Sequence, residues 1–227
     1  MDPTMQVVVG WLAFGGSHTA LSHPPVRSRL VARLGERGFL LFYSLVALGV
    51  FVPLVWTFFA NRIATPIPLP VLVRVPGVAW GTMALMLVAV PLIVLGFASP
   101  NPVSALTGRA GSGATGALRI TRHPGFMGVA LAGLAHLLVN RAPIDRAFFG
   151  GLVLYCVVGC WHQDGRRRNA AGTALAPFFA ETSFLPFVAI LQGRNRLVLR
   201  ELRPVPLAAS LGLYALLFNF HHRIFGG

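Results

Sequence analysis

Residues 38–60 of this chain read GFLLFYSLVALGVFVPLVWTFFA, a run without a single charged side chain. An α-helix needs about 20 mostly apolar residues to cross the hydrocarbon core of a bilayer. The run meets that length, and uninterrupted apolar stretches of this kind are rare in soluble domains. It therefore predicts a helix that crosses a membrane.

Similar apolar runs recur along the whole chain of 227 residues, of which 55% are hydrophobic and only 11% are charged. The further runs are residues 5–22, 75–98, 125–140, 144–162 and 205–220. We expect one domain over residues 1–227, an all-α polytopic membrane helix bundle with about six transmembrane helices. Two prolines interrupt residues 171–193, which predicts an interfacial segment and not a seventh span. No basic segment precedes the first run, so a cleaved signal peptide is not predicted.

The net charge of +13 comes from 19 basic residues, all of them arginine, against 6 acids. Fourteen arginines fall in residues 23–37, 99–123 and 164–204, and five fall in the alternate loops. Cytoplasmic loops carry such an excess, so we expect a multi-pass protein of the bacterial inner membrane with both termini in the periplasm. A protein that binds nucleic acid typically has a soluble domain with a basic face in which aromatic residues are interleaved. The sequence does not predict such a face, so the expected partner is the lipid bilayer and not a nucleic acid.

Two of the seven histidines, His18 and His136, lie inside apolar runs. An imidazole in hydrocarbon usually has a ligand or a function, and a buried haem iron would explain both residues. Small residues stand one turn before each of them, Gly15 in one case and Ala132 and Gly133 in the other. They either leave a slot for a flat macrocycle or let helices pack closely. Hydrogen-bonded histidines in a haem-free structural protein are the simpler alternative.

Arg122 and His123 precede the fourth run, at its expected cytoplasmic end. His123 and His136 differ by about 220° around one helix, so the two cannot readily share a metal. Arg122 and His123 could instead hold a haem propionate, a substrate or a phospholipid, or they could cap the helix. Asp164, directly after the fifth run, could pair with Arg122 across the cytoplasmic face.

Cys156 and Cys160 lie one helical turn apart, on the same face of the fifth predicted helix. They do not form the Cys-x-x-Cys-His motif, so covalent attachment of a c-type haem is not predicted. We expect both cysteines to be small buried hydrophobic residues.

One iron shared by His18 and His136 requires the two histidines to lie at similar depth in the membrane. If the first helix ended at Ser22, His18 would lie about 6 Å from its cytoplasmic end, whereas His136 lies about 20 Å from His123. We therefore predict that the first helix continues to Arg27, beyond its apolar run.

A series of short motifs resembles the NnrU family and its plant relative, the zeta-carotene isomerase of carotenoid synthesis. The motifs are Ser17-His18, Gly35-Glu36-Arg37, Val75-Pro76-Gly77-Val78, Arg119-Ile120-Thr121-Arg122-His123-Pro124, Leu134-Ala135-His136, Trp161 to Asp164 with Arg166-Arg167, and Ser183-Phe184-Leu185-Pro186-Phe187 with Gly193-Arg194. They follow one another in the family's order over nearly the entire chain.

The resemblance implies a b-type haem protein that rotates the central cis double bond of a carotenoid when its iron is reduced. By the same resemblance, the axial ligands of haem b map onto His18 and His136. His123 matches the Arg-His-Pro histidine and is the candidate catalytic residue, with Arg122 as a candidate cofactor-binding residue. A further family histidine is replaced near Asn61. The bacterial branch is associated with nitrite and nitric oxide metabolism, and hence with denitrification.

Three functions remain open at this point beside that of a haem-free structural protein. One is a haem-dependent cis–trans isomerase of a carotenoid-like polyene, which needs an electron donor of unknown identity to reduce the iron. Another is a haem protein of electron transfer or nitric oxide metabolism without isomerase activity. The third is a membrane methyltransferase that shares the Arg-His-Pro motif. The later acidic cluster of such methyltransferases is absent here, since Glu181 and Glu201 stand alone.

Overall fold

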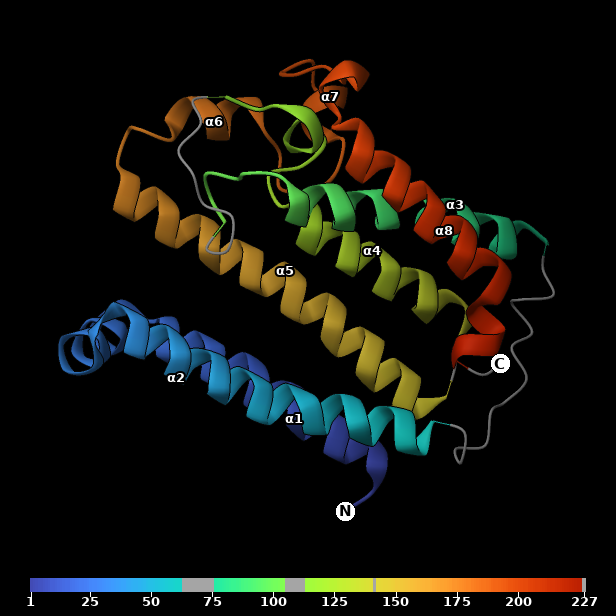
Figure 1. The fold of residues 1–227 in the computed structure, drawn as a ribbon, viewed down its shortest axis with the longest axis horizontal. Helices are drawn as coiled ribbons and strands as arrows, with labels where there is room; N and C mark the ends of the chain where they lie inside the picture. The colour runs from blue at the N-terminus through green and yellow to red at the C-terminus, as the bar shows by residue number, and fades with distance from the viewer. Residues whose placement is uncertain (63–75, 105–112, 141, 226–227) are drawn as a thin grey trace.

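A computed structural model of the chain describes residues 1–62, 76–104, 113–140 and 142–225. Over these residues the chain is helical, with connecting loops and no β-strand (Figure 1). The helices are α1 (Pro3–Ser22), α2 (Pro24–Asn61), α3 (Pro76–Ala98), α4 (Pro124–Val139), α5 (Pro143–Ala171), α6 (Ala176–Glu181), α7 (Val188–Leu191) and α8 (Pro204–Phe225). Short 3₁₀ turns lie at Gly116–Arg119 and Leu199–Glu201.

Each of the six apolar runs forms a helix, so the expectation of an all-helical membrane bundle is confirmed. Three helices are long and apolar enough to cross a bilayer, namely α2, α3 from Gly77, and α5 to Ala170. Two shorter apolar helices accompany them, α4 and the Pro204–Phe220 part of α8. The proline-broken segment after α5 folds into the short helices α6 and α7, which are too short to span a membrane.

The first helix does not continue to Arg27, and the prediction that it does is wrong. α1 ends at Ser22, and His23 is extended, with φ −62° and ψ 129°. A residue that precedes proline is driven out of the helical region, so Pro24 ends α1 at His23. The same proline is well suited to the first turn of α2, in which Arg27 therefore lies.

α2 bends sharply at Gly35, where φ is 70° and ψ is 167°. Only glycine adopts this backbone conformation without strain, so the residue separates two parts of the helix. The part before the bend carries arginines, and the part after it contains the uncharged run of residues 38–60.

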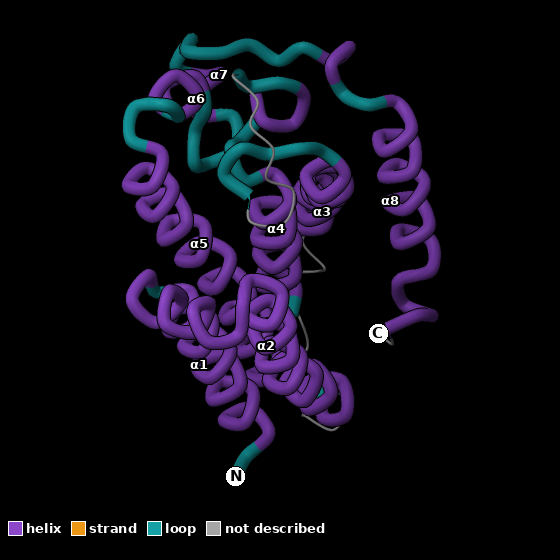
Figure 2. The backbone as a smooth tube through the Cα atoms, turned by 60° about the vertical axis from the view of Figure 1, so that its left-hand side comes forward, coloured by secondary structure: helices purple, strands orange, loops and turns teal. Residues whose placement is uncertain are grey.

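The bundle is built from neighbouring pairs of helices (Figure 1). α1 and α2 form a hairpin that packs on α5; α5 packs on α4, and α4 on α3. α8 contacts α3, and Figure 2 shows it on the outer side of that helix, away from α1 and α2. α6 and α7 lie at one end of the bundle, α6 towards the last turns of α5 and α7 near the start of α8 (Figure 1).

The small residues of α4 allow its neighbours to approach closely. A Cβ atom placed on Gly96 of α3 would lie 2.1 Å from the backbone nitrogen of Gly125, so the two helices touch backbone to backbone. A Cβ atom on Gly133 would lie 2.8 Å from Cγ2 of Val153. The space one turn before His136 is therefore filled by a side chain of α5. Of the two interpretations of these small residues, close helix packing holds for α4.

Aromatic side chains fill the core where α1, α2 and α5 meet. Trp11 and Phe14 of α1 are buried there with Phe58 of α2 and Phe148 of α5. The rings of Phe58 and Phe148 stack with their centroids 4.0 Å apart. This aromatic core joins the three helices.

Candidate functional site

A partly open groove of about 1430 Å³ lies between α1, α2 and α5. Its lining is mostly apolar and includes glycines from two helices, among them Gly16 and Gly150. A Cβ atom on either of these two glycines would meet no other atom within 4 Å, so the groove is open beside the backbone at both positions. Cys156 and Cys160 also line the groove as buried free thiols, in agreement with the prediction of small buried side chains.

His18 lies in the wall of this groove, half-buried. Its Nδ1 is 3.0 Å from the carbonyl oxygen of Phe14 on the preceding turn. Because a carbonyl oxygen only accepts, Nδ1 carries the hydrogen, and Nε2 of the neutral ring keeps its lone pair. A backbone carbonyl on one ring nitrogen is the usual arrangement for a histidine that binds a metal through the other nitrogen. His18 is thus oriented as a ligand would be.

Two tyrosines flank the same imidazole. The ring centroid of His18 lies 4.9 Å from that of Tyr43 on α2 and 5.7 Å from that of Tyr155 on α5. The ring of Phe14 lies 4.2 Å away. Three helices therefore hold the orientation of one side chain, and both tyrosines also line the groove.

His136 has different surroundings. Its ring stacks on Phe149 of α5, with centroids 4.3 Å apart and an angle of 7° between the planes. Its Nδ1 lies 3.2 Å from Nδ2 of Asn140. His136 is not among the residues that line the groove.

The structure does not bring His18 and His136 together. They contact α5 at Tyr155 and Phe149, positions separated by about 9 Å along the helix axis and by about 240° around it. Because α1 ends at Ser22, His18 and His136 are expected at different depths in the membrane. Their contacts with different turns of α5 agree with this difference. His18 is grouped with tyrosines, and His136 is packed against a phenylalanine.

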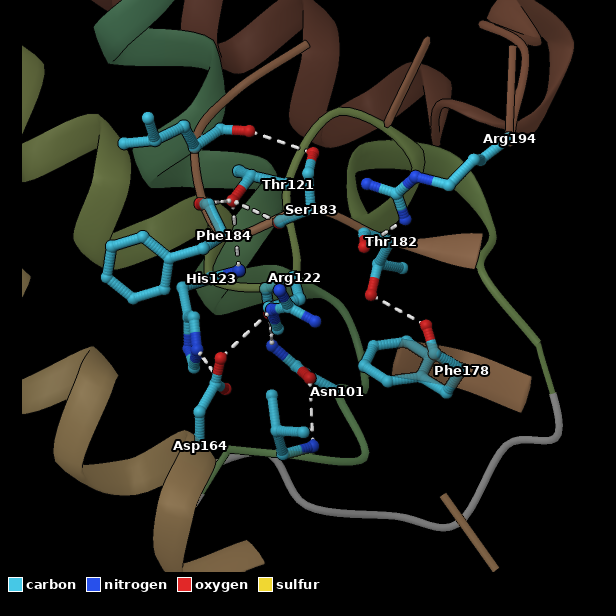
Figure 3. A network of polar contacts seen from close by, with 12 residues as sticks. Asn101, Thr121, Arg122, His123, Asp164, Phe178, Thr182, Ser183, Phe184 and Arg194 are labelled. Carbon is cyan, nitrogen blue, oxygen red and sulfur yellow. Dashed lines mark hydrogen bonds and ion pairs between the residues drawn. The ribbon is translucent and has the colours of Figure 1, made fainter. Parts of the chain in front are cut away.

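Arg122 and His123 form a second polar cluster, at the end of the bundle near α6 (Figure 3). His123 Nε2 lies 2.7 Å from Oδ1 of Asp164, and Arg122 Nε lies 3.0 Å from Oδ2 of the same carboxylate. Arg122 is 7% exposed and His123 is 3% exposed. The predicted pair of Arg122 and Asp164 is confirmed. Neither Arg122 nor His123 lines the groove of His18.

Backbone contacts join this cluster to loops distant in sequence (Figure 3). The Thr121 hydroxyl donates to the carbonyl oxygen of Phe184 at 2.6 Å, and the backbone N–H of Arg122 donates to that of Ser183 at 2.9 Å. The Asn101 side-chain amide donates to the Arg122 carbonyl oxygen at 2.8 Å. Hydrogen bonds from Asn101 and to residues 183–184 therefore hold the loop before α4, so residues 121–123 have a structural role.

The buried charge of Arg122 is compensated by its partner Asp164. Burial lowers the pKa of the Arg122 guanidinium, and the Asp164 carboxylate opposes that effect. Arg168 and Arg194 add two further cations nearby. Arginine nevertheless stays protonated in proteins, so Asp164 is needed to neutralise a buried charge.

A separate ion pair connects the two 3₁₀ turns. Arg119 Nε lies 2.7 Å from Oε2 of Glu201, and Arg119 Nη2 lies 2.9 Å from Oε1. The backbone N–H of Gly116 donates to Oε2 at 2.9 Å. These donors, with Arg119 the largest contributor, lower the pKa of Glu201 to about 2. Glu201, which has no neighbouring acid in sequence, is thus a structural carboxylate.

No role in a site was predicted from the sequence for Tyr43, Tyr155 or Arg166, all of which line the groove with His18. A signal was present for the tyrosines, since they are two of only three in the chain and each lies inside an apolar run. Arg166 belongs to a run of arginines after the fifth apolar run. The usual excess of arginine in cytoplasmic loops is enough to explain these arginines. Its place in the groove follows from the packing of α5 on α1.

Comparison with known proteins gives a consistent assignment. The family model described as NnrU protein matches residues 6–227. The chain is similar to the chloroplastic 15-cis-zeta-carotene isomerase of Zea mays, with 37% identity over 83 residues, 37% of this chain and 23% of that protein. The corresponding protein of Arabidopsis thaliana is 35% identical over 81 residues, 36% of this chain and 22% of that protein. The matched part is thus about a quarter of either plant isomerase.

No solved structure matches this chain. The family match covers nearly all of the sequence, including every residue of the groove and of the Arg122 cluster. This all-helical membrane protein belongs to the NnrU protein family.

Proposed function

We propose that this protein binds haem b in the groove through His18 and acts on a carotenoid-like polyene as a cis–trans isomerase. One observation carries the proposal: a half-buried imidazole, with its Nδ1 bonded to a backbone carbonyl, lines an apolar groove of about 1430 Å³. The similarity to the plant isomerases supports the choice of reaction.

The residues of the groove fit a porphyrin. In the described part of the chain, no group of three or more His, Cys, Asp or Glu side chains could hold a metal ion. An iron bound by His18 would therefore take its other ligands from a macrocycle. The space beside Gly16 and Gly150 offers a flat ring close approach to α1 and α5. Apolar walls are typical of cofactor sites of this kind.

A single histidine ligand suits the proposed reaction. His18 would hold haem b in the groove, and His136, which contacts another stretch of α5 and does not line the groove, would not take part. Bound haem b supplies a reducible iron that exchanges electron density with a polyene without net redox change. His18 holds the iron, Tyr43 and Tyr155 fix the His18 ring, and the apolar lining excludes water from the substrate.

An apolar substrate would enter this groove from the lipid. Leu12 of α1 and Leu40 of α2 line the groove and are 70% and 53% exposed. Large exposed apolar side chains are expected where a membrane protein faces the bilayer. The side of the groove that these two leucines line is thus the proposed path for a polyene.

The membrane orientation is also proposed. Helices α1 to α5 and α8 would cross a bacterial inner membrane six times, with both termini in the periplasm, as the arginine distribution indicates. The packing of α1 on α5 supports this. Trp11 lies beside Phe148 and Ser22 beside Arg166, so the two helices run parallel, as the first and fifth spans must.

The geometry does not favour the methyltransferase alternative. Arg122 and His123, its shared motif, are bound to Asp164 and buried outside the groove. A haem protein of nitric oxide metabolism would use His18 in the same way. Incubating the reduced protein with a 15-cis polyene separates that alternative from an isomerase, because only the isomerase releases the trans product.

The proposal is tested by the absorbance spectrum of the purified protein supplied with haem. We expect a Soret band that is lost in His18→Gly and restored when free imidazole is added to that variant, since imidazole fills the space left by the side chain. Restoration also shows that His18→Gly is folded. A wild-type protein without a Soret band, or a His18→Gly variant with an unaltered spectrum, contradicts the proposal.

A further inference from the structure

The groove of His18 is charged mainly at one end. The charged side chains along it are Arg27, Glu36, Arg146, Arg166 and Arg167. Arg146 lies in the first turns of α5, and the others lie near the start of α2 or the end of α5. His18 is one turn before Ser22, the last residue of α1, so the arginine-rich end is close to the proposed ligand.

Two of the arginines at that end have partners that occupy them. Arg27 forms an ion pair with Glu36 and lies over the ring of Phe39, 5.2 Å from its centroid. Arg167 donates to the carbonyl oxygens of Val103 at 3.3 Å and Ser104 at 2.9 Å. Neither guanidinium is free to receive an additional anion without giving up these contacts.

Arg166 differs from both. Within the described part of the chain, its one hydrogen bond is a long contact of 3.4 Å from Nη1 to the carbonyl oxygen of Ser22. A guanidinium has five N–H donors. Among the residues that the structure describes, no carboxylate pairs with Arg166, and the charged groups that act on it include the cations Arg27 and Arg167. A half-buried cation in a groove, next to other cations, is the arrangement that receives an anion.

We propose that Arg166 binds a carboxylate of the molecule that occupies the groove. The inference deepens the proposed function and rests on it for the identity of the ligand. With haem b in the groove, the carboxylate is a propionate; otherwise it is the head of an acidic amphiphile. Arg166 takes the role that the sequence suggested for Arg122, whose guanidinium is bound to Asp164 outside the groove.

The first experiment compares haem b with its dimethyl ester, in which both propionates are uncharged. Each is titrated into the detergent-purified apoprotein, and the Kd is read from the Soret band. We expect wild type to prefer the free acid by about tenfold or more, as the loss of a charged hydrogen bond requires. Arg166→Gln should bring this ratio of Kd values close to one. The ratio cancels any general loss of stability in the variant.

Arg33→Gln is the matched control, because Arg33 is exposed on α2, lies outside the groove and carries the same charge. It should keep the wild-type ratio. If Arg166→Gln also keeps that ratio while haem still binds, the inference about Arg166 is overturned and the proposed function stands.

A second probe tests Arg166 even if no haem binds, the outcome that contradicts the proposed function. It is 11-(dansylamino)undecanoic acid, compared with its methyl ester by dansyl fluorescence in the same detergent. We expect wild type and Arg33→Gln to bind the acid more tightly than the ester, and Arg166→Gln to bind both alike. If haem does not bind, equal acid-to-ester ratios for this probe in wild type and Arg166→Gln overturn the inference.

Discussion

His123 Nε2 and Asp164 Oδ1 lie 2.7 Å apart, and their contact joins the start of α4 to the end of α5. The second oxygen of the same carboxylate contacts Arg122 at 3.0 Å. One acidic side chain thus serves two buried basic ones, at the end of the bundle where the loops of residues 99–104 and 182–187 also meet. The cluster secures the fold at this end, and its three side chains do not line the groove that we propose as the functional site.

Asp164→Ala should destabilise the protein by about 3–5 kcal/mol, because it leaves the buried charge of Arg122 without its partner. Thermal unfolding in detergent measures the loss. Glu36→Gln is the control: it removes one partner of an exposed ion pair, and such pairs contribute at most about 1 kcal/mol. Equal effects of the two substitutions would show that the cluster does not stabilise the fold.

Gly96→Ala should cost about 1–3 kcal/mol, since its Cβ atom would lie 2.1 Å from the backbone nitrogen of Gly125 and force α3 and α4 apart. Gly81→Ala in the same helix meets nothing within 4 Å. That control should be neutral or up to about 1 kcal/mol stabilising, because alanine favours a helix over glycine. A Gly96→Ala protein as stable as wild type would contradict the close backbone contact.

The ion pair of Arg119 and Glu201 should make the thermal stability of the protein depend on pH in the acidic range. The pKa of Glu201 is about 2 in the folded protein and 4.5 ordinarily, so the carboxylate binds its proton more weakly when folded. Its contribution is therefore complete above about pH 5 and is lost as the pH falls towards 2. Melting temperatures of wild type and Glu201→Gln should differ at pH 6 and converge on acidification. A difference that stays constant down to pH 2 would contradict this assignment.

His136→Ala should keep the haem content and Soret band of the wild-type protein, in contrast to His18→Gly. The substitution removes the stacking of His136 on Phe149 and leaves the groove unchanged. Its effect should instead appear in stability, as a lower melting temperature in detergent. Loss of the Soret band from a folded His136→Ala protein would restore the two-histidine arrangement that the family resemblance implies.

Several features of the fold were predictable because they depend on local sequence. The length of each apolar run predicted a helix, and the run of residues 38–60 did so without ambiguity. The end of α1 before His23 was also predictable, since Pro24 disfavours a helical residue before it. A first helix that continued to Arg27, as one iron shared by His18 and His136 requires, would break that local rule.

A membrane bundle of helices, and the place of His18 as a polar group within an apolar run, follow from the sequence alone. The position of His18 in a groove with Tyr43 and Tyr155, and the stacking of His136 on Phe149, depend on the tertiary structure. Composition and periodicity predict that a segment is helical, but they do not fix its rotation or depth against its neighbours. Those are set by packing, which in this protein includes the close approach of α3 to α4 and the aromatic core of α1, α2 and α5.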